Sequence, residues 1–314
     1  MLARAALALC LGLGSLLGAC ATPRADTSAP TSDADVATTP APAGTWERLP
    51  QAPRVGRYVS SPWGFSTVSY WIEGPQGVVL VDTQFLPSAA EELVAVAEQQ
   101  TGKPVVAAVV LHANPDKFNG TATLQARGIE VLTSDQVLAK IPEIHAIRVE
   151  AFGERYAPDY PTALPQPEGF GDTSTTLHLA GLQLRAHVLG PGCSGAHVAL
   201  EWEGHLFVGD LVANGAHSWM ELGLSDQWLA RIDELQALGA THVHPGRGAW
   251  GGPELLTAQG EYLRRVQTLV AAEHAALHGR GEPSEAEVDE ALARVRQTLE
   301  QEHPGYRYGV FLAI

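Results

Sequence analysis

The chain has 314 residues, of which 45% are hydrophobic and 18% are charged, and its formal net charge is −15. This length and composition suit one or two globular domains with a sizeable core. The acidic balance argues against nucleic acid or an anionic membrane surface as the main partner.

The first twenty residues, MLARAALALCLGLGSLLGAC, have an early Arg4, an apolar stretch and small residues before Cys20. This pattern predicts a secretory signal over 1–20 and is too short for a spanning helix. Its end, LGAC, resembles a bacterial lipobox, which implies lipid on Cys20; a conventional signal cleaved nearby is the alternative. With Ala21 following, the resemblance implies a cell-envelope protein, anchored in the outer membrane and facing the periplasm in a Gram-negative cell.

Residues 21–45 are rich in Ala, Thr, Ser, Pro and Asp and contain almost no large apolar residue. Such a segment cannot bury enough surface to fold, so we interpret it as a linker. Globular patterning begins near Trp46. We therefore predict one domain over 46–250 and a helical extension over 251–314. Of the three cysteines, Cys10 lies in the predicted signal and Cys20 would carry lipid. Cys193 would then be the only free thiol, which excludes an intramolecular disulfide.

Short strands and helices alternate along the predicted domain. Strands are indicated by TVSYWIEG and GVVLVDT, which a Gly-Pro-Gln-Gly turn joins, and then by VVAAVVLHA and IEVLTS. PSAAEELVAVAEQQTG reads as a helix closed by Gly102. Residues 138–172 contain several prolines, and we predict an irregular loop over one face. A second set of strands, TTLHLAG, LQLRAHVLG, AHVALEWEG and HLFVGDLV, precedes the helix SDQWLARIDELQALG and the strand THVHPG.

Two amphipathic helices, near 252–278 and 284–302, end the chain. Two strand-rich halves, each followed by helices, indicate an α/β fold with two packed sheets and helices outside them.

Polar residues stand at four strand ends, in YWIEGPQGVVLVDTQ, LHANPDKFNG, GPGCSGAHVAL and FVGDLV, and a fifth motif, HPGRG, follows. Their order and spacing over about 55–250 resemble the metallo-β-lactamase superfamily. The resemblance implies an αββα sandwich, and the family's chemistry is hydrolysis with one or two zinc ions that activate water. Asp82 stands in the family's "DTG" position.

Most of the family's metal ligands are altered in this sequence. In LHANPDKFNG, which corresponds to the family's H-x-H-x-D-H, His112 and Asp116 are retained, whereas Asn114 and Lys117 replace histidines. The other three positions hold Cys193, Asp210 and Arg247, of which only Asp210 is retained; the resemblance would make His112, Asp116, Cys193 and Asp210 the catalytic and metal-binding candidates.

The two implied metal positions differ in chemistry. Asp116 and Asp210 would face Lys117 and Arg247, and an arginine cannot deprotonate to bind a metal ion. We therefore predict a neutral ion-pair cluster at the second position. The first position would keep His112, Asn114 and Cys193, so at most one zinc ion is implied.

The sequence is also compatible with a pocket that holds no metal ion. Cys193 beside His112 could act as a thiol nucleophile, or it could be a small buried hydrophobe. Lys117 and Arg247 would hold an anionic ligand, with Asn114, and with His217 and Trp219 from a neighbouring loop. His197 and His244 are expected to have structural roles.

Two hypotheses result. In the first, the protein hydrolyses a small ester, thioester or amide through one metal ion or the Cys193–His112 pair. In the second, it is catalytically silent and binds a small anionic ligand or a partner. The altered ligands argue against β-lactam hydrolysis and against two-metal hydrolysis of any kind.

Overall fold

The computed structural model describes residues 43–279 and 282–307. The predicted signal over 1–20, with Cys20, and nearly all of the predicted linker lie outside the described residues. Among the described residues, no helix has the length and apolar character needed to cross a membrane.

The first sheet has seven strands in the order β1-β2-β3-β4-β5-β6-β7. Pairing is antiparallel from β1 to β4 and parallel from β4 to β7. The strands are β1 (Thr45–Leu49), β2 (Ala52–Val59), β3 (Val68–Glu73), β4 (Val78–Val81), β5 (Val105–Val109), β6 (Glu130–Thr133) and β7 (Glu168–Gly169).

The second sheet has five strands in the order β12-β11-β10-β9-β8. All its pairs are antiparallel except β11 with β12. The strands are β8 (Thr175–Leu179), β9 (Leu182–Leu189), β10 (His197–Trp202), β11 (His205–Ala213) and β12 (His242–Arg247).

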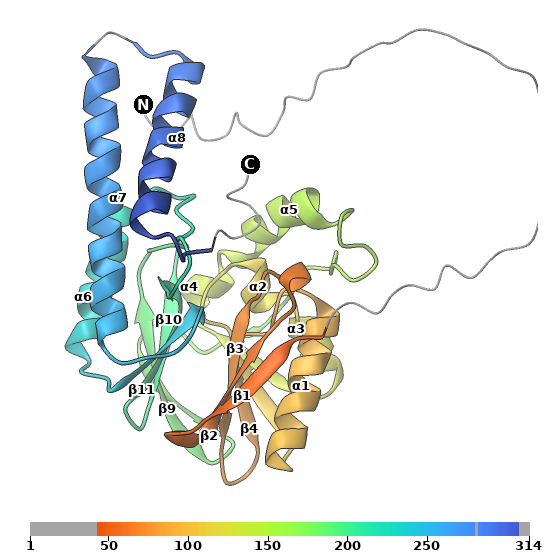
Figure 1. Cartoon of the computed structure of the whole chain (residues 1–314). Coiled ribbons are helices and arrows are strands. Elements are labelled where there is room, and N and C mark those ends of the chain that lie inside the picture. The colour runs from red at the N-terminus through yellow and green to blue at the C-terminus, as the bar shows by residue number, and fades with distance from the viewer. Residues whose placement is uncertain (1–42, 280–281, 308–314) are drawn as a thin grey trace, which may run out of the picture. The chain divides into compact units, whose positions relative to one another are not determined.

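Helices cover the outer faces of both sheets (Figure 1). Helices α1 and α3 contact the first sheet, and α6 and α7 contact β11 of the second. This arrangement confirms the predicted αββα sandwich. The helices are α1 (Pro87–Thr101), α2 (Pro115–Phe118), α3 (Thr121–Ala126), α4 (Asp135–Leu138), α5 (Ile141–Phe152), α6 (Ser225–Ala237), α7 (Glu254–His278) and α8 (Glu285–Glu302), with a 3₁₀ turn, η2, at Pro62–Gly64.

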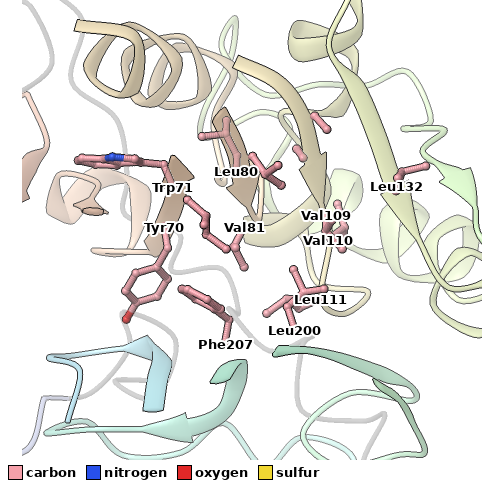
Figure 2. Close-up of a cluster of buried hydrophobic side chains, with 14 of the residues drawn as sticks. Tyr70, Trp71, Leu80, Val81, Val109, Val110, Leu111, Leu132, Leu200 and Phe207 are labelled. Atoms are coloured by element: carbon pink, nitrogen blue, oxygen red, sulfur yellow. The ribbon is translucent and has the colours of Figure 1, made fainter. Parts of the chain in front are cut away.

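The main core lies between the two sheets. Figure 2 shows Tyr70, Val81 and Leu111 beside Leu200 and Phe207 of the second sheet. All five side chains are buried. The Tyr70 and Phe207 rings are edge to face at 5.4 Å, and the Tyr70 hydroxyl donates to the carbonyl oxygen of Pro245 at 2.9 Å. This contact links the two sheets close to the end of β12.

Gly56 shows why one strand position excludes a side chain. Gly56 of β2 pairs with Trp71 of β3. A Cβ atom at Gly56 would come within 1.8 Å of the Trp71 indole. The indole can occupy this place against β2 only because position 56 is glycine.

The prediction of an irregular loop over 138–172 is wrong for its first part. Ile141–Phe152 form α5, with Pro142 in the first turn. Proline is tolerated there because the first amide groups of a helix have no intrahelical acceptor. The segment is held down by an aromatic cluster that includes Phe85, Phe152, Tyr156 and Tyr160.

The two predicted C-terminal helices are present as α7 and α8, which lie side by side (Figure 1). Helix α8 begins with a capping box. The Ser284 side chain accepts from the amide of Glu287, and the Glu287 side chain accepts from the amide of Ser284. This reciprocal pair satisfies two amide donors that would otherwise be free at the start of the helix.

Candidate functional site

A pocket of about 410 Å³ opens where several strands end. Polar residues reach it from the segment after β5, from β11 and the loop that follows, and from the end of β12. Six of the predicted site residues line this pocket: Asn114, Asp116, Asp210, His217, Trp219 and Arg247. The other three, His112, Lys117 and Cys193, lie beneath its surface and are buried.

Lys117 holds the floor of the pocket together. Its ammonium nitrogen, which has no exposed surface, lies 2.9 Å from Asp210 Oδ1 and 3.1 Å from Asp116 Oδ2. A third carboxylate oxygen, Asp82 Oδ2, lies at 3.9 Å. The ammonium group therefore stands among three acids, and it bridges the two that the sequence placed at the second metal position.

Arg247 closes the same cluster from the pocket side. Its Nη2 contacts Asp116 Oδ2 and lies 3.3 Å from Asp210 Oδ2. Its Nη1 donates to the Phe65 carbonyl oxygen and to Thr67 Oγ1, both at 3.1 Å. The ion pairs expected between two carboxylates and two fixed cations are thus present.

Electrostatic coupling keeps this cluster ionised. Burial alone would raise the pKa of Asp210, but the charges of Arg247 and Lys117 outweigh it and lower that pKa strongly. Burial would likewise lower the pKa of Lys117, yet Asp116 and Asp210 hold it above its usual value. Both groups remain charged at neutral pH.

Asp82 behaves differently, although it stands beside the same ammonium group. Burial raises the pKa of Asp82 to about 7, against the opposing effects of Lys117 and the Leu111 amide. Its Oδ1 accepts from that amide at 2.8 Å. Asp82 is thus partly protonated near neutral pH, which leaves Asp116 and Asp210 to balance Lys117 and Arg247.

Glycine at position 246 allows β12 to approach the cluster. A Cβ atom there would lie 2.0 Å from Asp210 Oδ1 and 2.7 Å from the backbone carbon of Gly209. Any side chain would push β12 away from β11. The guanidinium of Arg247, one residue later, would then lose its place beside the carboxylates.

A second polar group lies beneath the pocket: His112, Cys193 and His197, which we name the thiol–histidine group. One ligand atom from each lies within 4.8 Å of the others, and all three residues are buried. Within residues 43–279 and 282–307 it is the only such group of three that could hold a metal ion. His112 Nε2 lies 3.9 Å from Asp210 Oδ2, so this group adjoins the ion-pair cluster.

Burial sets the protonation of the thiol–histidine group. Desolvation lowers the pKa of His112 to about 3 and lowers the pKa of His197 well below its usual value. It raises the pKa of the Cys193 thiol well above the usual value. In the absence of a ligand, both imidazoles and the thiol are neutral at neutral pH.

Sequence reasoning placed His197 in a structural role, and it does accept a hydrogen bond from the Ser194 amide at 3.0 Å. The sequence did not predict that the His197 ring also lies next to Cys193 and His112. The Cys-x₃-His spacing was the signal that could have indicated it. His244 has the structural role expected of it, since it is buried and bonded to His205 at 2.9 Å.

Three arginines of the pocket wall were also missed: Arg57, Arg148 and Arg307. Arg57 lies on β2 and Arg148 on α5, and neither element was predicted. No local sequence signal distinguishes these arginines from surface arginines. Only the fold brings them together.

The sequence profile of the metallo-β-lactamase superfamily matches residues 62–247. The chain belongs to this superfamily. No curated protein sequence matches the chain.

Solved structures with the same fold include a metallo-β-lactamase from Pontibacter korlensis, with 22% identity and a TM-score of 0.58 over 70% of this chain and 99% of the other. A Pseudomonas aeruginosa metallo-β-lactamase in its mono-zinc form has 19% identity and a TM-score of 0.57, over 71% and 96% of the two chains. An enzyme from Erythrobacter litoralis has 18% identity and a TM-score of 0.55, over 70% and 96%. At these identities the likeness establishes the fold alone.

The superfamily typically binds zinc, and the residues present fit a metal ion at only one of the two positions. Between Asp116 and Asp210 stands an ammonium group with a guanidinium beside it, and neither can ligate a metal ion. A divalent ion placed there would also be repelled by both charges. The thiol–histidine group, in contrast, offers imidazole nitrogen and sulfur, which are good zinc ligands.

Proposed function

We propose that the protein binds a small organic anion in this pocket and has a noncanonical site that does not support two-metal hydrolysis. The observation that carries the proposal is the charge of the pocket wall. Four arginines and two aspartates line the pocket of a chain whose formal net charge is −15. Lys117 and Arg247 already balance the two aspartates, so the charges of the other three arginines are not offset by acids that line the pocket.

The partners of two of these arginines are easily exchanged for a ligand. Arg57 pairs with Glu47 at 2.9 Å, and Arg148 pairs with Glu221. The two glutamate side chains are 48% and 43% exposed. Because both glutamates are largely in contact with water, they can return to solvent when a bound carboxylate or phosphate takes their place beside the arginines.

The apolar wall indicates the rest of the ligand. Phe65, Phe85, Phe152 and Trp219 line the pocket together with the arginines. The Arg148 guanidinium lies 5.8 Å from the centre of the Trp219 ring. This combination suits an anion that carries an aromatic or aliphatic body, because the body loses water contact while the charged end meets guanidinium groups.

Hydrolysis of a small ester, thioester or amide is the second candidate. It is favoured by Asp116 and Asp210, two carboxylates that border the pocket above His112. Attack by the Cys193 thiol is the weaker route to it. That thiol is buried beneath the pocket and its pKa is raised, so little thiolate forms at neutral pH.

A binding experiment separates the two candidates. Aromatic and aliphatic carboxylates and phosphate monoesters are titrated by calorimetry into the purified protein and into Arg148→Gln. We expect the variant to bind the best compound about 10- to 100-fold more weakly, the loss of one charge-assisted hydrogen bond. Arg264→Gln on α7, at a side chain that is 57% exposed and outside the pocket, is the matched control.

Binding that Arg148→Gln leaves unchanged would refute the assignment of this pocket to anions. The same compounds as esters, thioesters and amides serve as a turnover screen. Turnover that is lost in Asp210→Asn would establish hydrolysis instead.

We also propose that the mature chain is exported and held at the cell envelope by lipid on Cys20. The support is the LGAC sequence after an apolar stretch and the polar residues that follow. Radioactive palmitate should label the protein and not Cys20→Ser. Equal labelling of both would exclude a lipid at this position.

A further inference from the structure

We infer that His112, Cys193 and His197 together hold one thiophilic metal ion, Cu(I) or Zn(II), beneath the anion pocket. The ligand set includes His197, which lies in the same GPGCSGAHVAL motif as Cys193, four residues after it. It excludes Asp116, which is committed to Lys117 and Arg247. The site is separate from the pocket proposed for anions and does not depend on that proposal.

The distances match a shared metal ion. Cys193 Sγ lies 3.7 Å from His197 Nε2. A sulfur and a nitrogen bound to one tetrahedral ion, at bond lengths of about 2.3 and 2.0 Å, are about 3.5 Å apart. The third ligand comes from the other sheet, since His112 forms an isolated bridge with His197 and their rings are 5.0 Å apart. The three ligand atoms are therefore already close to the spacing that one shared ion requires.

Unsatisfied nitrogen atoms point to a ligand in this group. Among the described residues, neither ring nitrogen of His112 has a hydrogen-bond partner, and neither does His197 Nδ1. A buried polar atom without a partner costs about 1–3 kcal/mol. His112 is fully buried, so bulk water cannot supply the missing partner. A metal ion on one His112 nitrogen would satisfy it.

His197 is held in the form that a metal ion needs. Its Nε2 accepts the Ser194 amide hydrogen, which places the lone pair on Nε2 and the ring proton on Nδ1. A metal ion would take the place of this hydrogen bond. Cys193 and Ser194 lie in the loop between β9 and β10, so the Ser194 amide must shift within that loop for an ion to bind Nε2.

The ligand chemistry favours a thiophilic ion. The charge of Asp210 acts on His112 and on Cys193 in opposition to those of Lys117 and Arg247, so neither sign of charge dominates at the group. When the metal binds, the Cys193 sulfur loses its proton to solvent and the thiolate bonds to the ion. Soft sulfur ligands also select Cu(I) and Zn(II) over harder ions.

Metal content and spectroscopy test the site without an activity assay. The purified protein is loaded anaerobically with Cu(I) against a competing chelator, and separately with Zn(II), and metal per chain is measured after desalting. We expect about one ion per chain and none in Cys193→Ser. His197→Gln should bind at least about tenfold more weakly. His278→Gln, at an exposed histidine of α7, is the control and should bind as the unaltered protein does.

Two further measurements keep the test independent of folding defects in the variants. In the unaltered protein, Co(II) should produce a thiolate charge-transfer band. Bound metal should also protect Cys193 from alkylation. Metal binding that survives both Cys193→Ser and His197→Gln, or no binding of either ion by the unaltered protein, would overturn the inference. These readouts do not involve anions, so failure here leaves the anion proposal standing.

Discussion

Replacing Lys117 by methionine tests whether its ammonium group holds the pocket floor together. Methionine has a similar length and no charge, so the change removes the charge with little change in packing volume. Among the described residues, it leaves Asp116 and Asp210 with Arg247 alone, and it leaves Asp82 with no cation within 4 Å. Side-chain exposure at Lys117 is 0%, so water cannot replace the lost ammonium group without a change of structure.

The expected cost follows from this burial. Removing one partner of a buried ion pair costs about 3–5 kcal/mol, because the remaining charge is left without compensation. A domain of ordinary stability has about 5–15 kcal/mol in total, so the variant should unfold at a much lower denaturant concentration. Lys117 lowers the pKa of Asp82, so without it that pKa, already raised to about 7, rises further. A carboxyl group whose pKa is raised in the folded state makes folding less favourable as pH rises, so the cost of the substitution should be larger at pH 8 than at pH 5.

Equilibrium unfolding in urea at the two pH values measures both effects. Lys117→Met combined with Asp210→Asn is the matched control, since it removes one charge of each sign. The double variant should recover at least about half of the lost stability. A cost below about 1 kcal/mol, typical of an exposed pair, together with no pH dependence, would refute the account of the floor as a buried ion-pair cluster.

Two other predictions concern the core. The imidazoles of the thiol–histidine group have lowered pKa values, so stability should be lost as pH falls from about 6.5 towards 3, with a slope of about 1.4 kcal/mol per pH unit for each ring. Asp82, whose pKa is raised to about 7, makes stability rise as pH falls, but this single group does not cancel the effect of the two imidazoles. Unfolding midpoints that stay constant between pH 7 and pH 4 would contradict this prediction. Gly56→Ala should destabilise by about 1–3 kcal/mol because the new methyl group meets the Trp71 ring, whereas Gly305→Ala, with no atom within 4 Å of the added carbon, should have little effect on the thermal midpoint.

Local pattern was enough to predict most of the fold. The strands around Tyr70 and Val109 and the helices α1, α6, α7 and α8 have periodicities and end signals that depend on neighbouring residues in the chain. The ion pairs among Asp116, Asp210, Lys117 and Arg247 could also be foreseen. The motifs that contain them stand at strand ends, which this fold brings to one edge, and buried carboxylates require cations.

The tertiary structure decided what each polar residue meets. Helix α5 was missed because prolines do not show whether they interrupt a helix or begin one. Arg148 and Arg57 reach the pocket from elements that are distant in sequence, and charge alone does not reveal such a meeting. Cys193 and His112 were expected in the pocket, but packing between the sheets buries them with His197. The direction of a side chain at a strand end is set by long-range packing, whereas the sequence by itself determines only that the strand ends there.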